Sequence, residues 1–474
     1  MTLALFEGLA LFGTVAGMIV LWGHPLLADW PGVAAVLAQA ATFSLCCMVA
    51  FYYNDLYDFR IVRTVGGFVS RLFQSLGVAM ILVAGLYELV PKAKIAEGPF
   101  FSSILVIVGI LLLLRTVTYG IMHHPAFADR VLIVGSGSLA HKLIDAIEAH
   151  PHVGYRIVGV ADDERPSNPP LYYPFLGPLR CLAKIIAEVQ PDRIIVAMQE
   201  RRGRMPMDQL LEAQARGIPV EDGLRTYEHC TKKLAIETLT PSVLIFSGGF
   251  IETRLHATLR RLVSLGVAAA GLVLTAPIMA LIVVAIKLDS PGAVLFVQDR
   301  VGQRRRHFKL LKFRTMVPSD GRVSEWVQDN EDRVTRVGWW LRKFRLDELP
   351  QFVNILRGDM NLVGPRPHPV SNSALFADQI PYYALRTGIR PGVTGWAQIR
   401  YGYANNLEEE IEKMRYDLYY IQHVSFWFDV RILVDTVKIV LFGRGSQAAD
   451  VYRPQAPADP GLVSSLAAKF GNRS

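Results

Sequence analysis

The chain has 474 residues, 51% of them hydrophobic, and a formal net charge of +8 at pH 7. This length allows two to four domains, and the hydrophobic content argues against a purely soluble protein. Residues 254–446 carry 27 Lys and Arg against 18 Asp and Glu, which suits anionic substrates and an anionic membrane surface. Nucleic acid is disfavoured as a partner because no nucleic-acid motif accompanies this charge. The four cysteines lack the spacing of a zinc site or a disulfide framework.

Four long apolar runs occupy the first part of the chain, at 3–22, 33–53, 69–90 and 100–122. Each is long enough to cross about 30 Å of hydrocarbon. The first run has no basic segment before it and no cleavage site after it, which favours a retained helix over a signal peptide. Arg115 lies inside the fourth run, where it either faces the bundle interior or extends to the interface. We therefore predict a four-helix transmembrane bundle over residues 1–124.

The charges of the connecting loops predict the orientation of this bundle. Arg60, Arg63 and Arg71 follow the second run, whereas the loop before that run has no Lys or Arg. Lys92 and Lys94 in the third loop are a mild contrary signal. The first contrast places residues 54–70, and hence both ends of the bundle, in the cytoplasm.

A parallel α/β domain is predicted over residues 128–247. Strand-like runs at 130–134, 155–160, 193–198 and 218–221 alternate with helical segments. The first strand leads into a Gly-x-Gly-x-x-Ala turn at Gly135 and Gly137, and the second ends at Asp162, the position of an acid that binds a ribose. These features predict a Rossmann-like fold.

Ligand binding by this domain is a separate question. A short-chain dehydrogenase needs a Tyr-x-x-x-Lys pair, but Tyr227 is followed by Thr231 at that offset. We favour a structural or regulatory role, and binding of a dinucleotide or of another nucleotide at Gly135, Gly137 and Asp162 stays open as the alternative.

A further uncharged run of 25 residues spans 262–286. Pro277 in its middle removes a backbone hydrogen bond, and Thr275 can satisfy a carbonyl that is freed. Both flanks are basic, which predicts that the segment enters and leaves on the cytoplasmic face as a re-entrant, broken helix over 257–287. The alternative is a kinked spanning helix, which would place the acidic pair described below outside the cytoplasm.

Adjacent carboxylates, Asp347 and Glu348, follow the basic cluster of Arg342, Lys343 and Arg345. Neighbouring carboxylates can bind a hard divalent cation or divide nucleophile and base roles. Arginines match phosphate oxygens through their planar fork, and Arg366 follows between two prolines. The combination points to phosphoryl transfer on a metal-bound diphosphate. A solvated charged helix is the alternative.

Four ordered segments resemble the bacterial sugar transferases, the monotopic polyprenyl-phosphate phosphoglycosyl transferases. They are SPGAVLFVQDRVG at 290–302, FKLLKFRTM at 308–316, LRKFRLDELPQFVNILRGDMNLVGPRP at 341–367 and RPGVTGWAQI at 390–399, followed by DLYYI at 417–421. The preceding regions resemble the large exopolysaccharide-type members. The end of the region is most similar to the subgroup that accompanies exosortase-type systems.

The resemblance implies an α-rich monotopic catalytic domain over 254–446 with a helix-break-helix membrane anchor. It implies transfer of a sugar 1-phosphate from a UDP-sugar to polyprenyl phosphate with Mg²⁺, through a phosphosugar adduct on Asp347. Glu348 is then a metal ligand or base, and Asp347 also contacts the metal. The matched motifs mark Arg342, Arg366 and Arg390 as phosphate-binding cations. Lys312 and Arg314 alternate in FKLLKFRTM, which predicts that both point to one face of an extended segment and makes them further candidates for phosphate binding. We expect His368 and His423 to be structural.

Two further functions remain as alternatives: a nucleotide-sugar dehydratase or epimerase built on the α/β domain, and a non-catalytic scaffold for polysaccharide assembly. Aromatic and cationic residues at 339–344 and 426–431 suit either the lipid headgroup layer or an ordinary core helix. We expect a multi-pass protein of the bacterial inner membrane with both soluble domains on the cytoplasmic face, a flexible tail at 447–474, and self-association left open.

Overall fold

The structure is a computed structural model. It describes residues 2–22, 30–54, 56–57, 65–123, 128–164, 173–198, 204–236, 239, 252–317, 333–402, 404 and 406–441. The chain forms two compact units, Met1–Gly223 and Leu224–Ser474. The predicted tail at 447–474, and Arg60 and Arg63 of the loop used for orientation, lie outside the described residues.

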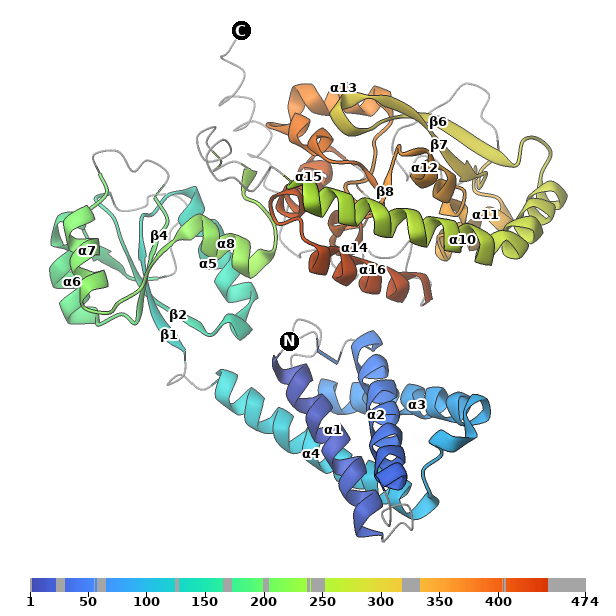
Figure 1. Cartoon of the computed structure of the whole chain (residues 1–474). Coiled ribbons are helices and arrows are strands. Elements are labelled where there is room, and N and C mark those ends of the chain that lie inside the picture. The colour runs from blue at the N-terminus through green and yellow to red at the C-terminus, as the bar shows by residue number, and fades with distance from the viewer. Residues whose placement is uncertain are drawn as a thin grey trace. The chain divides into compact units, whose positions relative to one another are not determined.

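The N-terminal helices are α1 (Thr2–Leu21), α2 (Trp30–Tyr53), α3 (Val65–Leu89) and α4 (Glu97–His123), with a short η2 (Pro91–Ala93) before the last. All four are long and apolar enough to cross a membrane, and they pack around a shared hydrophobic core (Figure 1). Arg115 on α4 is fully buried and pairs with Glu7 on α1 at 2.8 Å. The structure therefore places Arg115 inside the bundle, where its charge meets the one acidic residue of α1.

The α/β domain contains a five-stranded parallel sheet of order β3-β2-β1-β4-β5. Its strands are β1 (Asp129–Val134), β2 (Tyr155–Ala161), β3 (Phe175–Gly177), β4 (Arg193–Val196) and β5 (Val220–Asp222). In Figure 1, α5 (Ser138–Ala149) lies on one side of this sheet, and α6 (Leu182–Val189) and α7 (Met207–Ala215) lie on the other. The predicted Rossmann-like fold is confirmed; the three-residue β3 was too short to predict.

The second unit begins before the boundary expected at 247. After α8 (Gly223–Thr231), residues Leu234 and Ile236 are buried in the core of this unit, and the Leu234 amide donates to the carbonyl of Arg415 at 3.1 Å. The described residues that follow α8 therefore belong to the second unit rather than to a linker before it.

The membrane element of this unit is α10 (Arg254–Asp289), a single helix of 36 residues with Pro277 inside it. Its ribbon bends before its C-terminal end (Figure 1). Thr275 donates its hydroxyl to the carbonyl of Gly271 at 2.7 Å, a bond that bends helices. The carbonyl freed by Pro277 is that of Val273, four residues before it, so Thr275 does not donate to the freed carbonyl as we expected.

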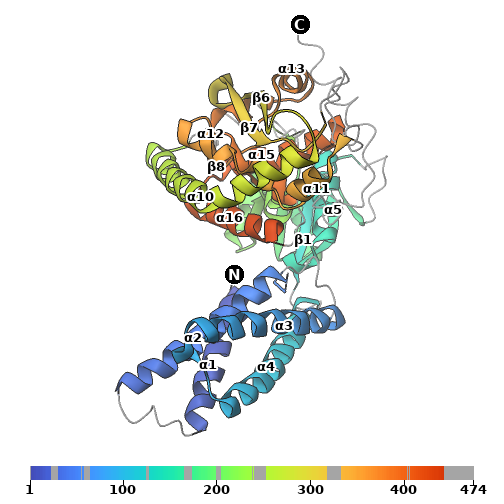
Figure 2. The same ribbon diagram turned by 90° about the vertical axis from the view of Figure 1, so that its right-hand side faces the viewer.

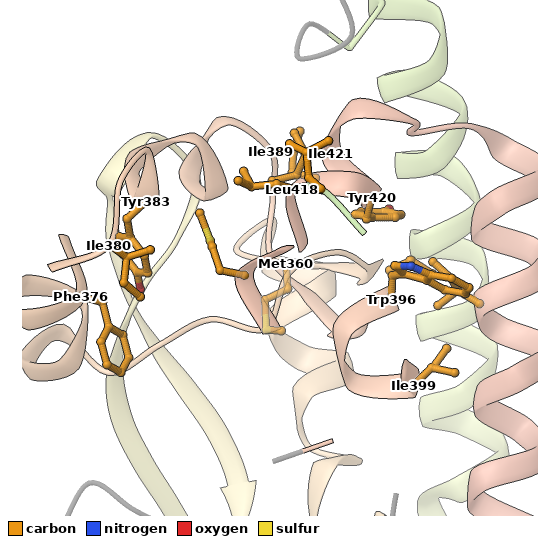
Figure 3. Close-up of a cluster of buried hydrophobic side chains, with 14 of the residues drawn as sticks. Met360, Phe376, Ile380, Tyr383, Ile389, Trp396, Ile399, Leu418, Tyr420 and Ile421 are labelled. Atoms are coloured by element: carbon orange, nitrogen blue, oxygen red, sulfur yellow. The ribbon is translucent and has the colours of Figure 1, made fainter. Parts of the chain in front are cut away.

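The second unit, which we call the catalytic body from here on because it contains the acidic pair, is α-rich. It also contains a long β6–β7 hairpin (Leu295–Val301 and His307–Phe313), labelled in Figure 2. Its further elements are α11 (Arg336–Lys343), η9 (Leu346–Glu348), α12 (Gln351–Arg357), β8 (Asn361–Val363), α13 (Val370–Gln379), η10 (Tyr383–Gly388), β9 (Gly392–Thr394), α14 (Trp396–Arg400), α15 (Leu407–Gln422) and α16 (Phe426–Leu441). Figure 3 shows the core of this body, where Trp396 lies beside Tyr420, and Tyr383 beside Phe376 and Ile380.

Candidate active site

A short 3₁₀ turn, η9, carries the two adjacent carboxylates. Arg345 just before it adopts a left-handed conformation with φ 53°, which is uncommon for a residue with a side chain and ends α11 abruptly. Asp347 is 9% exposed and Glu348 6% exposed. The alternative of a solvated charged helix is therefore wrong, because both carboxylates are buried at a strained turn.

Glu348 is surrounded by cations from three elements. Its Oε1 lies 2.9 Å from Arg366 Nη1 and 3.3 Å from Lys312 Nζ, and its Oε2 lies 3.8 Å from Arg345 Nη1. Burial raises its pKa, but Arg366, Lys312 and Arg345 outweigh burial and hold the pKa well below its usual range. The surrounding cations therefore favour the charged form of Glu348.

Asp347 has the opposite environment. Within the described residues its carboxylate accepts no hydrogen bond, and its ion pair with Lys312 is long, at 3.9 Å. Burial raises the pKa of Asp347, since Lys312, Arg366 and Arg342 only partly offset the loss of water. A desolvated carboxylate with free lone pairs beside several cations is suited to attack an electrophile or to bind a metal.

Arg366 and Arg390 are brought close together by the backbone. Strands β8 and β9 pair in parallel, and the Gly392 amide donates to the carbonyl of Pro365 at 3.0 Å. A Cβ on Gly364 would lie 2.5 Å from the Arg390 carbonyl oxygen, so glycine is needed for this approach. The two proline-flanked arginines thus come from adjacent chain segments, and Arg366 reaches the acidic pair.

The side chains of two other predicted cations, Arg342 and Arg314, donate to groups other than the acidic pair. Arg342 donates from Nε to Thr315 Oγ1 at 3.1 Å, and its charge lowers the pKa of Asp347. Arg314 instead donates to the carbonyls of Ser290 and Pro291 at 2.7 and 2.8 Å. The structure places Arg314 at the C-terminal end of α10.

Sequence reasoning did not single out Arg300. This arginine on β6 is half-buried, and it donates from Nη1 to the carbonyl of Pro367 at 2.8 Å. Burial and the charge of Arg366 lower the pKa of Arg300 to about 9. The sequence signal that could have identified Arg300 is its position in the VQDRV strand, where it faces the same side as Gln298.

His368 is buried, as expected of a structural residue, but it is not isolated. Its Nδ1 lies 2.6 Å from the Tyr383 hydroxyl, and its Nε2 lies 3.0 Å from Glu410. Burial and the nearby Arg386 lower the pKa of His368 to about 3. His423 stacks on Tyr419 and is exposed.

The acidic pair fits a magnesium site of the kind completed by substrate. No group of three or more His, Cys, Asp or Glu residues that could hold a metal occurs among the described residues. Mg²⁺ is commonly held by one or two carboxylates together with substrate phosphates and water. Asp347 offers free oxygens for this purpose, whereas those of Glu348 already face cations.

The glycine turn of the α/β domain is occupied by one of its own side chains. Asp162 Oδ2 accepts hydrogen bonds from the Ser136 amide and hydroxyl, both at 2.7 Å, and Oδ1 accepts one from the Asp163 amide. The Ser136 amide is thus not available to a phosphate. In α8, Thr231 donates its hydroxyl to the carbonyl of Tyr227, at the position where a dehydrogenase would need a lysine.

Comparison with known proteins identifies the C-terminal region. Residues 255–443 match the bacterial sugar transferase family, and residues 52–213 match a CoA-binding domain family. The chain is 29% identical over 443 residues to a UDP-glucose:undecaprenyl-phosphate glucose-1-phosphate transferase of Escherichia coli, covering 91% of this chain and 92% of that protein. The similarity to the exosortase-associated subgroup stays a prediction.

Two relatives are more similar over shorter stretches. A UDP-glucose:undecaprenyl-phosphate glucose-1-phosphate transferase of Caulobacter vibrioides is 45% identical over 192 residues, which is 40% of this chain and 72% of that protein. A UDP-N-acetylgalactosamine-undecaprenyl-phosphate N-acetylgalactosaminephosphotransferase of Aeromonas hydrophila is 39% identical over 231 residues, 48% of this chain and about half (54%) of that protein's length. The chain therefore belongs to the bacterial sugar transferase family.

Proposed function

We propose that this enzyme transfers a sugar 1-phosphate from a UDP-sugar to undecaprenyl phosphate, releasing UMP, as the first membrane step of exopolysaccharide assembly. The names of the relatives support both substrates. The observation that carries the proposal is the pair of unlike acids: a buried Asp347 with free lone pairs, beside a Glu348 held by Arg366 and Lys312.

The proposed reaction depends on the difference between Asp347 and Glu348. Asp347 attacks the phosphorus that bears the sugar, and the bond from that phosphorus to the bridging oxygen breaks, so that UMP leaves with the electron pair. A phosphate oxygen of the lipid acceptor then attacks the same phosphorus and releases the Asp347 carboxylate. Splitting the transfer into two steps in this way is nucleophilic catalysis.

The cations have the task of neutralising the diphosphate. An anionic nucleophile is repelled by phosphate oxygens unless positive charge is fixed nearby. Lys312, Arg342, Arg366 and Arg390 supply that charge, and Arg366 is held rigid between Pro365 and Pro367. Mg²⁺, held by Asp347 or Glu348 and the donor phosphates, would act as a Lewis acid on those oxygens.

The proposed membrane arrangement is a re-entrant α10 with the active site on the cytoplasmic side of the inner membrane. Both ends of α10 are tied to the same catalytic body: Arg260 pairs with Asp429 at 2.6 Å, and Asp289 accepts from the Val337 amide at 3.1 Å. Between them the helix exposes large apolar side chains, including Val273, Leu274 and Leu281. Trp339 and Trp340 are also about half exposed, and we assign them to the headgroup layer.

The contacts of Arg260 and Arg261 weaken the argument that the basic flanks of α10 indicate re-entrance. Arg261 donates to the carbonyls of Ile355 and Met360, so both arginines serve as ties to the protein rather than as free interfacial charges. The geometric tie at both ends therefore supports re-entrance better than the basic flanks do. Cysteines introduced near 256 and 289 should both be labelled from the cytoplasmic side. Labelling of either cysteine from the periplasmic side would contradict a re-entrant α10.

The activity is tested with purified protein in detergent, undecaprenyl phosphate and a panel of UDP-sugars that includes UDP-glucose and UDP-N-acetylgalactosamine. We expect UMP release with at least one donor. Without the lipid acceptor, UMP should appear in an amount no greater than the enzyme present, because the adduct on Asp347 cannot turn over. A strict requirement for both substrates before any UMP appears would rule out the two-step route.

A further inference from the structure

The segment that carries Arg366 is held at four consecutive backbone carbonyls. Pro365 O accepts from the Gly392 amide at 3.0 Å, and His368 O accepts from the Val301 amide at 3.0 Å. The two carbonyls between them accept from side chains: Arg366 O from Arg386 Nη2 at 3.0 Å, and Pro367 O from Arg300 Nη1 at 2.8 Å.

Arg386 is oriented by a carboxylate on another element. It lies on η10 and is 6% exposed, and its Nε and Nη2 donate to Asp417 Oδ2 on α15 at 2.9 and 2.6 Å. Two charge-assisted hydrogen bonds to one carboxylate oxygen hold this edge of the guanidinium against Asp417. The remaining nitrogen, Nη1, faces His368 Nδ1 at 2.8 Å and the Tyr383 hydroxyl at 3.3 Å.

Side-chain packing alone does not fix this segment. A cavity of about 20 Å³ lies between it and η10, lined by residues that include Arg366, His368, Tyr383 and Arg386. That volume has room for about one water molecule. Hydrogen bonds, rather than close packing, therefore hold the Arg366 carbonyl on this side.

The charge of Arg386 is matched by that of Asp417, so Arg386 has no excess charge to offer a phosphate. Arg366, whose carbonyl it holds, points its own guanidinium at Glu348 at 2.9 Å. A small displacement of the Arg366 backbone would move that guanidinium away from Glu348 and from the donor phosphates, and misplacement of about 1 Å can cost about a hundredfold in rate.

We propose that Arg386, oriented by Asp417, is a positioning residue that sets Arg366 against Glu348 and the phosphates of the donor. This inference rests on the proposed transferase function for its kinetic meaning, but its geometry can be tested without activity. It also gives Asp417, the first residue of the DLYYI segment, a definite task.

The kinetic test is a double-mutant cycle on UMP release from the active donor of the panel and undecaprenyl phosphate. Arg386→Lys keeps a charge but cannot hold both Asp417 and the Arg366 carbonyl with the same geometry. We expect it to lower kcat by about 10- to 100-fold in the wild-type background and by less than about threefold in an Arg366→Lys background, because residues acting as a unit are not additive.

Arg415→Lys is the matched control, since Arg415 is a buried arginine of the same helix as Asp417 and pairs with Glu412 at 2.6 Å. Its effect should be the same factor in both backgrounds. An equal loss for Arg386→Lys in the two backgrounds would overturn the proposal, because it would show a general structural effect rather than action through Arg366.

A second measurement separates this inference from the proposed function. Hydrogen exchange of the full-length protein should be faster at the Gly392 and Val301 amides, which donate to the carbonyls of Pro365 and His368, in Arg386→Lys and Asp417→Asn than in wild type, and unchanged there in Arg415→Lys. Unchanged exchange at these amides in both variants would refute the positioning role, even if no UDP-sugar supports UMP release. Faster exchange together with an inactive wild type would instead leave the positioning role standing and reject the transferase assignment.

Discussion

Asp162 and Asp347 are two partly hidden acids at two turns of one chain, and the structure treats them in opposite ways. Asp162 accepts hydrogen bonds from two backbone amides and a hydroxyl. Asp347 accepts none within the described residues, and burial raises its pKa. A carboxylate whose lone pairs are used by its own turn stabilises that turn, whereas one left free among cations is available for chemistry.

The hydrogen-bond donors and cations around Asp162 and Asp347 differ in the same way as the two acids. The glycine turn of the α/β domain gives its Ser136 amide to Asp162, so the anion it would attract is already present. At the catalytic turn the cations Lys312 and Arg366 converge on Glu348 and leave Asp347 with a long ion pair. We therefore propose that the phosphate chemistry belongs to the second unit and that the glycine turn has a structural task.

The largest effect that this comparison predicts is on Asp347. Asp347→Asn keeps the shape but removes the anion, so we expect UMP release to fall by about a thousandfold or more while membrane insertion and thermal stability stay unchanged. The stoichiometric release of UMP without acceptor should also disappear.

Glu348→Gln is the informative companion variant. It leaves Arg366, Lys312 and Arg345 facing a neutral group, so it should reduce both activity and stability, and its effect should not add to that of Asp347→Asn. If Asp347→Asn retained activity while Glu348→Gln lost it, the roles assigned to the two acids would have to be exchanged.

Gly135 tests the structural half of the comparison. Its φ of +110° is unfavourable for any side chain, and a Cβ would lie 3.0 Å from the backbone of Ala197. Gly135→Val should therefore destabilise the α/β domain by about 2–4 kcal/mol, measured by thermal unfolding or by protease resistance.

Gly137 provides the control for this effect. We expected both glycines to shape the turn, but Gly137 has φ −74° at the N-cap of α5, with nothing near its missing Cβ. Gly137→Ser should be neutral or slightly stabilising, because serine is a favoured N-cap residue. Equal damage from the two substitutions would mean that the turn has a function beyond its backbone geometry.

These glycines show how far sequence reasoning reached. The apolar runs and strand alternations are local patterns, so the long apolar helices and four of the five strands of the α/β sheet could be predicted within a few residues. The motifs also brought Lys312, Arg366 and the acidic pair together correctly. Arg314 was misplaced because its guanidinium donates to the carbonyls of Ser290 and Pro291, and no local pattern indicates those partners.

The residues that were missed share a different cause. Arg300 and Arg386 hold backbone carbonyls of a segment that is 67 and 20 residues away, respectively. Nothing in the composition around an arginine indicates which distant carbonyl it will meet. The inclusion of Leu234 and Ile236 in the catalytic core escaped prediction for the same reason, since it depends on contacts with α15.

His368 adds a buried group that protonation, rather than mutation, can disturb. Its pKa is lowered from 6.5 to about 3, chiefly by burial. Between these two values the unfolded chain binds the proton and the folded chain does not, so stability is complete above pH 6.5 and is lost as the pH falls. The loss should approach about 1.4 kcal/mol per pH unit, or about 2 kcal/mol at pH 5.

The measurement is the apparent Tm of the purified protein from pH 8 to pH 5, compared with His368→Gln. The variant should be less stable at pH 8 but should lose less stability on acidification, so the two curves should converge. Parallel curves would show that the pKa of His368 is the same in the folded and unfolded chains. A wild type that gains stability relative to the variant on acidification would show that His368 is protonated in the folded protein, and hence that Glu410 outweighs burial.

The smallest loss of stability that we predict is that of Asp162→Asn, and this variant tests whether the glycine turn is structural. An amide still accepts one hydrogen bond, but it loses the charge-assisted bonds to the Ser136 amide and hydroxyl, so the α/β domain should lose about 1–2 kcal/mol of stability. UMP release should be unchanged, since this acid takes no part in the proposed chemistry. In equilibrium dialysis the full-length protein should bind neither NAD nor coenzyme A, because the Asp162 carboxylate occupies the amide that their phosphates would need. Saturable binding of either ligand by the wild type, abolished in Asp162→Ala, would make Asp162 a ligand-binding residue and would remove the distinction between the two turns.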